Sequence, residues 1–125
     1  MSSVIVDTSV WRKYLAGVSL TRALGQLLDE DEVLLHPFVL GELTLGRLSD
    51  REASIFRRLP EAPVVDHAEV LAFVVERRLT RKGVGWVDAH LLASTFLAGA
   101  HLWSTDRALI AAARSLEVAF TDQPK

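Results

Sequence analysis

Short apolar runs alternate with helical patterns along the chain, and this alternation constrains the fold more than any other feature. Runs rich in valine and leucine predict strands at about 2–6, 33–36, 62–65, 101–104 and 118–120. Helical patterns lie between them, at about 8–15, 20–28, 37–48, 50–60, 66–79, 86–97 and 106–115. Strands joined by helices favour a parallel sheet with helices on both faces. We therefore predict an α/β fold.

Glycine and proline punctuate these elements where helices should begin and end. Gly17 and Gly99 are expected to end the helices before them, and Pro37 suits the first turn of a helix. The predicted helix at 66–79 carries Val70, Leu71, Val74 and Val75 on one face.

Four acidic residues lie within sequence that otherwise resembles core. Asp7 follows Val4-Ile5-Val6, and Asp106 follows the apolar run that begins at Leu102, so both lie where predicted strands end. Glu42 and Asp88 lie on predicted helices, with apolar residues three and four positions away on the same face. Sites in parallel α/β sheets form at the carboxyl ends of strands. We therefore predict that the four carboxylates meet there.

Each of these acids also has a simpler explanation. Asp7 and Asp106 would serve as helix N-caps, and Glu42 or Asp88 would each form a structural ion pair with an arginine. A buried carboxylate is costly unless a cation or hydrogen bonds compensate it, and here four occur together. Hard oxygen ligands in a chain without cysteine favour Mg²⁺ or Mn²⁺ over zinc. Such an ion would relieve carboxylate repulsion and activate a water against a phosphodiester.

The charge balance permits a phosphate-bearing substrate without demanding one. The formal net charge is −2, but setting aside the four acids leaves 12 acidic residues against 14 lysines and arginines. Arg12, Arg81, Lys82 and Arg107 lie near the acids in sequence and are candidates for phosphate contacts. Each of them would equally suit a solvated surface.

Aromatic and histidine residues give weaker signals. Trp11 and Trp86 flank acidic motifs and could stack on bases, although packing explains them as well. The four histidines contain no pair at i and i+4 on one predicted helix. We expect structural or surface roles for the histidines rather than a metal site.

Four motifs occur in order along nearly the whole chain: Asp7-Thr8-Ser9-Val10-Trp11, Leu40-Gly41-Glu42-Leu43, Gly85-Trp86-Val87-Asp88-Ala89-His90-Leu91-Leu92-Ala93 and Trp103-Ser104-Thr105-Asp106-Arg107-Ala108-Leu109. Each motif alone is weak, but together the set resembles the PIN domain, a metal-dependent nuclease fold. More narrowly, it resembles the VapC toxins of bacterial toxin–antitoxin pairs. The resemblance implies a three-layer α/β/α sandwich with a mainly parallel central sheet.

The same resemblance implies a Mg²⁺-dependent endoribonuclease, with Mn²⁺ as the alternative ion. The metal and its attacking water would be held by Asp7, Glu42, Asp88 and Asp106. Ser9 matches a polar position that would orient a ligand or the substrate. Arg107 and Ala108 stand where some relatives carry a further acid, which argues against a fully occupied second metal site.

Partners are also implied by the resemblance. Relatives cut structured RNA, often a tRNA or a ribosomal RNA loop, and are usually homodimers. A VapB-like antitoxin silences them by laying a C-terminal segment in an apolar groove and placing a basic side chain at the acidic site. The first four predicted helices, rich in leucine and valine, would supply that groove here.

Two other function classes remain open at this point. A non-catalytic RNA- or protein-binding module of the same fold would keep the acids without turnover. A phosphoacceptor receiver domain has a similar length and sheet type, but it expects paired acids after the first strand, whereas Asp7 stands alone, and its acceptor would not begin a helix as Asp50 does.

Length and composition set the remaining bounds. A chain of 125 residues fits a single domain, 1–125, that can bury a real core. No apolar run reaches the ~18 residues of a membrane span, and no signal peptide is evident at the N-terminus. We expect no membrane association and a cytoplasmic location.

Overall fold

A small parallel sheet forms the centre of the protein. The computed structural model describes residues 3–121, so Ser2, where the first strand was predicted to begin, lies outside the described residues. The strands are β1 (Val4–Val6), β2 (Val33–Leu34) and β3 (His101–Trp103), in the order β2-β1-β3. Both pairings are parallel, with Val4 opposite Val33 on one side and opposite His101 on the other. The predicted parallel sheet is therefore confirmed.

Two of the predicted strands are reduced to single bridges at the sheet edges. Leu35 pairs with Glu61 beyond β2, and Leu102 of β3 pairs with Ala119. The prediction of a full strand at 62–65 was wrong because Pro63 has no N–H group with which to extend the ladder. The segment 118–120 keeps only the bonds around Leu102.

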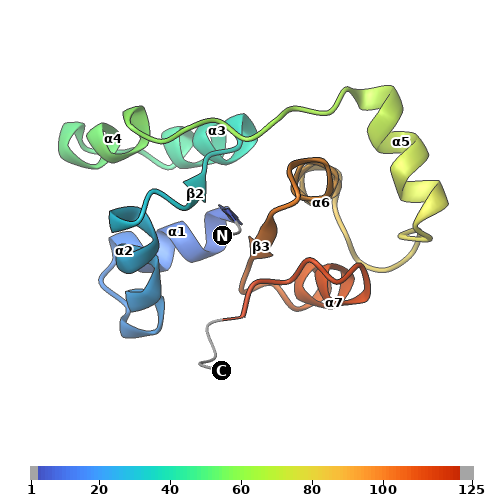
Figure 1. The fold of residues 1–125 in the computed structure, drawn as a ribbon. Coiled ribbons are helices and arrows are strands. Elements are labelled where there is room, and N and C mark those ends of the chain that lie inside the picture. The colour runs from blue at the N-terminus through green and yellow to red at the C-terminus, as the bar shows by residue number, and fades with distance from the viewer. Residues whose placement is uncertain (1–2, 122–125) are drawn as a thin grey trace.

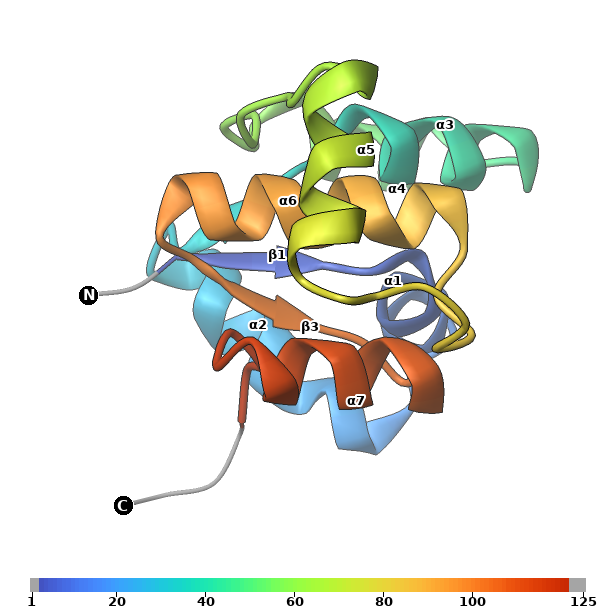
Figure 2. The same ribbon diagram turned by 90° about the vertical axis from the view of Figure 1, so that its right-hand side faces the viewer.

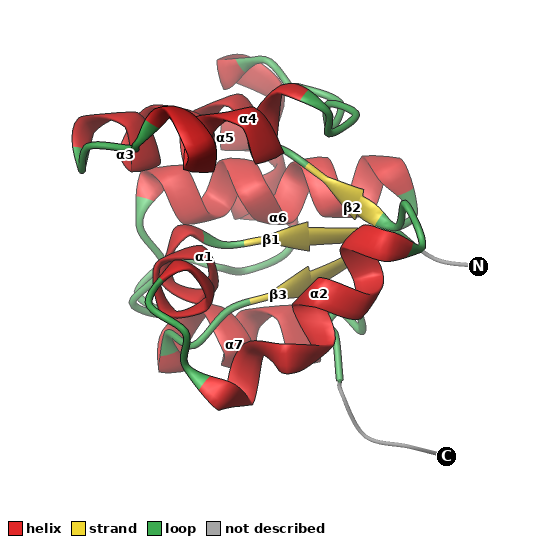
Figure 3. Cartoon of the chain, turned by 90° about the vertical axis from the view of Figure 1, so that its left-hand side faces the viewer, coloured by secondary structure: helices red, strands yellow, loops and turns green. Residues whose placement is uncertain are grey.

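Helices cover both faces of the sheet, as the layered α/β/α architecture requires (Figure 1). Figure 2 shows α6 on one face of β1 and β3, with α2 and α7 on the other, and Figure 3 shows α3, α4 and α5 on the α6 side. Within residues 3–121 the helices are α1 (Thr8–Leu15), the short 3₁₀ helix η1 (Ser19–Thr21), α2 (Arg22–Asp29), α3 (Pro37–Leu45), α4 (Asp50–Arg57), α5 (His67–Glu76), α6 (Trp86–Ala98) and α7 (Arg107–Ser115).

Several helix ends follow the predicted punctuation. Pro37 occupies the first turn of α3, Gly17 follows α1 with φ of +79°, and Gly99 ends α6 in the left-handed region with φ of +64°. Ser49 caps α4 through the Glu52 amide at 3.0 Å.

Helix α5 ends three residues earlier than the predicted Leu79. Arg78 adopts a positive φ of 55°, and the Leu79 amide then donates back to the Val74 carbonyl at 3.0 Å. This turn satisfies carbonyl groups at the helix end and lets Leu79 enter the core, where it is buried. In the same way Arg47, with φ of 69°, ends α3 before the predicted Leu48. No helix within 3–121 is both long and apolar enough to cross a membrane.

The predicted apolar face of α5 is only half buried. Val70 is buried and Val74 is partly buried against α6, where Ala89 and Ala93 lie. Leu71 and Val75 are instead 58% and 72% exposed, so only part of this apolar face is covered. The side of α5 that carries Val70 and Val74 packs against α6 and the main core, and Leu71 and Val75 lie outside this contact.

Candidate active site

Asp7 and Asp106 lie at the same edge of the sheet, where β1 and β3 end. The Asp7 amide donates to the Trp103 carbonyl at 2.8 Å, which continues the pairing of the two strands up to the site. Both carboxylates also cap the next helix. Asp7 Oδ1 accepts from the Thr8 amide at 2.8 Å, and Asp106 Oδ1 accepts from the Ala108 amide at 3.3 Å. Helix capping is thus one role of both acids, and strand pairing brings them together.

Two serine hydroxyl groups link the first and fourth motifs. Ser9 Oγ and Ser104 Oγ each donate to Asp7 Oδ2 at 2.8 Å. Ser104 Oγ also accepts from the Asp106 amide at 2.9 Å, and Ser9 Oγ accepts from the Thr105 amide at 3.2 Å. Asp7, only 8% exposed, is therefore held in one orientation by three donors.

Glu42 reaches the site from α3 through a threonine of the first motif. The Thr8 hydroxyl donates to Glu42 Oε1 at 2.6 Å, and Thr8 itself is buried. Because Thr8 also gives its amide to Asp7, one residue ties the first acid to the second. Helices α1 and α3 pack against each other, which brings these groups together.

Asp88 lies in the first turn of α6, where its Oδ2 accepts from the Gly85 amide at 3.2 Å. Burial raises the pKa of the Asp88 carboxyl above its usual range, and the negative charges of Asp7, Asp106 and Glu42 raise it further. The Gly85 amide acts in the opposite direction and does not cancel these effects. Asp88 therefore lies close enough to each of the other three predicted acids to feel its charge.

The carboxylate oxygens of this cluster suit a divalent cation, but their present positions do not surround one. The hydrogen bonds described for the four carboxylates come from backbone amides and hydroxyl groups. Oxygen donors whose charges repel one another are what Mg²⁺ and Mn²⁺ favour. Within residues 3–121, however, no three acidic or histidine side chains are arranged to enclose an ion. Asp88 and Asp106 point to helix amides, so rotation of these side chains would be needed to enclose one.

Sequence reasoning identified Ser9 but did not single out Thr8 and Ser104. Both are small hydroxyl residues next to an acid motif, and both are buried, at 4% and 8% exposure. Their signal in the sequence was position: Thr8 directly follows one acid, and Ser104 lies two places before another.

The predicted phosphate contacts are distributed around this edge. The loop that carries Arg81 and Lys82 runs against the start of α7, since a Cβ on Gly83 would lie 3.2 Å from the Ala108 Cβ. Both basic side chains are exposed, as is Arg107 beside Asp106.

Arg12 is exposed on α1 and lies against a different neighbour. Its Nη2 is 3.8 Å from where a Cβ on Gly46 would lie, just after α3. Arg12 is thereby associated with the helix that carries Glu42 rather than with the loop at 81–85.

Trp11 and Trp86 have different surroundings. Trp11 is completely buried and makes an edge contact with Phe56 at 4.8 Å between ring centroids, so it belongs to the core. Trp86 is 43% exposed at the start of α6, where its ring lies 4.7 Å from that of His90. Of the two, only Trp86 is available to contact another molecule.

Three histidines that are far apart in sequence meet beside α6. His67 Nδ1 lies 3.1 Å from His90 Nε2, and the Phe38 ring lies 5.0 Å from His36 and 4.8 Å from His90. His36 caps α3 by accepting from the Phe38 amide at 3.0 Å. Burial, and then the neighbouring His90, lower the pKa of His36 from 6.5 to about 4. Sequence spacing could not reveal this group because the histidines belong to three different helices: His36 caps α3, His67 begins α5 and His90 lies within α6.

Comparison with known proteins agrees with the motif order. Residues 4–115 match the family model described as PIN domain. Ribonuclease VapC32 of Mycobacterium tuberculosis, in the CDC 1551 / Oshkosh and the ATCC 25618 / H37Rv strains, is 42% identical over 123 residues. The alignment covers 96% of this chain and 98% of each relative.

A solved structure has the same fold at low sequence identity. The crystal structure of PAE2754 from Pyrobaculum aerophilum superposes with a TM-score of 0.57 at 20% identity. The match covers 89% of this chain and 79% of that one. At this identity the likeness supports the three-layer architecture alone.

Proposed function

Because the chain belongs to the PIN-domain family, among its VapC-type ribonucleases, we propose that it is the toxin of a toxin–antitoxin pair and cuts RNA with a bound Mg²⁺ or Mn²⁺ ion. The family assignment replaces the receiver-domain alternative, which would need a different set of acids. The substrate we propose is structured RNA, of the tRNA or ribosomal class that the resemblance implies.

The observation that carries the proposal is the convergence of all four acid motifs on one edge of the sheet. Asp7 is bound to groups of the fourth motif through Ser104, and Thr8 bonds to Glu42. Asp88 is close enough to the other three acids for their charges to raise its pKa. Unrelated surface acids would have no reason to be linked in this way by Thr8 and Ser104, each of which bonds to groups of two acid motifs.

We assign the metal to the four carboxylates, with Asp7 as the fixed member. Three donors hold the Asp7 carboxylate, so its orientation does not depend on the ion. When bound, a divalent ion would activate a water and polarise the phosphodiester for in-line attack. Ser9, which is partly exposed and donates to Asp7, would orient the ligand or the substrate.

Exposed basic residues near the acids would bind the RNA backbone. Arg81 and Lys82 lie on the loop against α7, Arg107 lies beside Asp106, and Arg12 lies on the α3 side. These cations on both sides of an acidic centre would hold phosphates without entering the carboxylate cluster. Binding should weaken with salt, as phosphate contacts do.

The partner we propose is a VapB-like antitoxin segment that lies between α3 and α4. A cavity of about 500 Å³ opens there, and Leu40, Leu45 and Leu48 line it together with Phe56. Leu45 is 90% exposed and Leu40 is 36% exposed, which is unusual for leucines without a partner. Glu42 lies on the same helix, so a segment bound there would also reach the acids. A homodimer is proposed from the family alone.

The decisive experiment measures RNA cleavage by wild type and Asp7→Asn, with Mg²⁺, with Mn²⁺ and with excess EDTA. Asparagine retains a capping oxygen, so α1 should still form while the ligand charge is lost. Asp50→Asn, on the exposed first turn of α4, is the matched control. We expect new 5′-phosphate ends only with metal and an intact Asp7.

Two outcomes would contradict the proposal. Cleavage that survives thorough chelation would exclude the metal mechanism. RNA binding without new ends, at every metal concentration, would identify a non-catalytic module of the same fold.

A further inference from the structure

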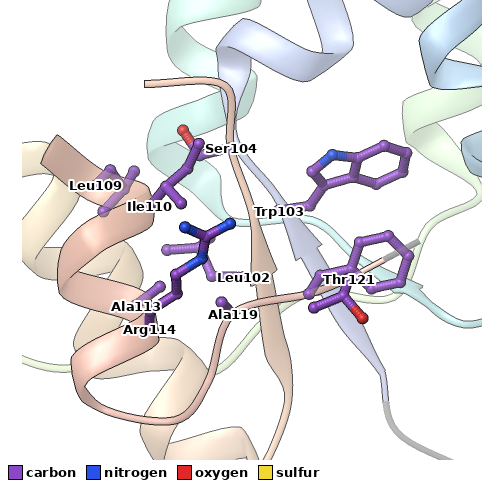
Figure 4. A pocket seen from close by; sticks show the side chains of 10 residues that line it. Leu102, Trp103, Ser104, Leu109, Ile110, Ala113, Arg114, Ala119 and Thr121 are labelled. Atoms are coloured by element: carbon purple, nitrogen blue, oxygen red, sulfur yellow. The ribbon is translucent and has the colours of Figure 1, made fainter. Parts of the chain in front are cut away.

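A cavity opens between β3, α7 and the segment that follows α7. It measures about 770 Å³, within the size range of pockets that hold small molecules (Figure 4). Its lining combines apolar, aromatic and basic groups: Leu102, Trp103, Ser104, Leu109, Arg114 and Phe120 are among its residues. The proposed catalytic acids do not line it, so it is a separate feature of the molecule.

One end of this cavity adjoins the acid site. Ser104 lines the cavity, and its hydroxyl group donates to Asp7 at 2.8 Å and accepts from the Asp106 amide at 2.9 Å. A molecule that fills the cavity up to Ser104 would therefore lie one side chain away from two of the four acids. The cavity and the acid site are neighbouring parts of one surface.

The walls of the cavity offer two kinds of contact. Trp103 and Phe120 form an aromatic pair, with ring centroids 4.7 Å apart and planes 35° apart. Arg114 is exposed on the last turn of α7, and Figure 4 shows its side chain extending along the cavity toward the end where Ser104 lies. Leu102 and Leu109 are almost completely buried, so they support the cavity wall from behind.

We propose that this cavity is a nucleotide subsite, which binds one unpaired base of the RNA next to the bond that is cut. The aromatic pair suits the face of a base, and the Arg114 guanidinium suits its phosphate. An apolar peptide would leave the arginine unmatched, and a free anion would leave the aromatic wall unused. The inference deepens the proposed function and rests on it for the identity of the RNA.

The first test separates the subsite from the acids. Arg114→Gln removes the cation at an exposed position, and Ile110→Phe adds bulk from α7 into the cavity. Arg58→Gln, exposed at the end of α4, is the control. We expect kcat/KM on an RNA of about 12 nucleotides to fall by roughly tenfold in both test variants and to stay unchanged in the control. Hydrolysis of bis-p-nitrophenyl phosphate, which has no base, should remain at the wild-type rate in all three.

The second test varies the substrate. The same RNA is prepared with a single abasic nucleotide at each position in turn. An abasic nucleotide at one position next to the cut should lower the rate of cleavage by wild type. The same abasic nucleotide should cause little further loss of cleavage by the Ile110→Phe variant. Equal abasic profiles for wild type and Ile110→Phe would overturn the subsite, as would full cleavage of the intact RNA by both variants.

A binding measurement keeps the result independent of catalysis. The measurement uses a Trp86→Phe variant with EDTA present, which leaves Trp11 and Trp103 as the tryptophans. Because Trp11 is buried in the core, changes in tryptophan fluorescence on ligand binding report on Trp103. Titration with AMP or UMP should change the fluorescence of this protein, and Ile110→Phe should abolish the change. Binding without RNA cleavage would support the subsite while the proposed nuclease activity fails, and no change on titration would overturn the subsite alone.

Discussion

The Ser104 hydroxyl group lies 2.8 Å from Asp7 Oδ2, although 97 positions separate the two residues. Ser104 also accepts the amide of Asp106, so one small side chain fixes the relative position of the first and the fourth acid. Its neighbour in sequence, Trp103, pairs with β1. The parallel sheet thus determines which residues can serve the site.

Ser104→Ala should lower activity more than stability. The change leaves Asp7 with two donors and frees the Asp106 amide, which positions a proposed metal ligand. Loss of such a supporting group typically costs about tenfold in activity or metal affinity. Cleavage kinetics at saturating Mg²⁺ check this, with Ser115→Ala as control because Ser115 only bonds to the Ala112 carbonyl of its own helix. Equal rates for the two variants would contradict the role of Ser104.

Thr8→Val should weaken metal binding. Valine keeps the branched shape of this buried residue but removes the hydroxyl group that donates to Glu42 at 2.6 Å. We expect the Mn²⁺ concentration for half-maximal cleavage to rise by about tenfold. Thr44→Val is the control, since its hydroxyl group bonds only to the Leu40 carbonyl on an exposed face. An unchanged Mn²⁺ requirement would show that Glu42 does not depend on this hydrogen bond.

His36 should make the fold sensitive to mild acid. Its pKa in the folded protein is about 4, against 6.5 ordinarily, so between these values the unfolded chain binds the additional proton. Stability should therefore fall as the pH drops from about 6.5 to 4, by up to roughly 3 kcal/mol from this group. Urea unfolding at pH 7.5 and at pH 5 measures the loss.

The matched variant for that measurement is His36→Asn. Asparagine can still cap α3 through the Phe38 amide, but it does not titrate. Its stability should change less between the two pH values than that of wild type, while His101→Asn, at a partly exposed strand residue, should behave as wild type does. Identical pH dependence in all three proteins would remove His36 as the cause.

Blocking the cavity between α3 and α4 should separate inhibition from catalysis. Ala53→Trp would place a large ring against Leu48 and Phe56, where the antitoxin segment is proposed to lie. RNA cleavage should be retained, and the antitoxin concentration for half-inhibition should rise at least tenfold. Ala68→Trp, exposed at the start of α5, is the control. Inhibition of both variants at the wild-type concentration would place the antitoxin elsewhere.

Substitution of two glycines separates the effect of moving the loop at 81–85 from the effect of backbone strain alone. Gly83 and Gly17 have nearly the same φ, +78° and +79°, but a Cβ on Gly83 would lie 3.2 Å from Ala108, whereas one on Gly17 would meet nothing within 4 Å. Both substitutions by alanine should cost about 1 kcal/mol of stability. Only Gly83→Ala should also reduce RNA cleavage, because it alone moves the loop from α7. Equal cleavage by both variants would leave Arg81 and Lys82 without a positional role.

The alternation of elements and the acid motifs were predictable because both depend on local pattern. Asp7 and Asp106 follow β1 and β3 as expected, and Gly99 ends α6. Contacts between distant elements were not predictable from periodicity. The burial of α5 depends on how much of α6 it can cover, which left Leu71 exposed.

The side chains that hold the acids in place were also not predictable from the sequence. Ser104 and Thr8 are common, small residues whose importance depends on the partner each one meets. The three histidines share no spacing, since folding alone brings His36 to His90. The cavity beside Ser104 likewise arises from the gap between α7 and the segment at 119–121.

The pairing of β1 with β3 has a consequence for synthesis. The ribosome releases β1 and Asp7 first, and it releases Ser104 and Asp106 only after most of the polypeptide has emerged. A truncated or still growing chain therefore lacks one of the three donors that hold its first acid, the Ser104 hydroxyl group. The four acids can therefore come together only after β3 has been translated, whereas helices α3 and α4, where the antitoxin segment is proposed to lie, leave the ribosome earlier.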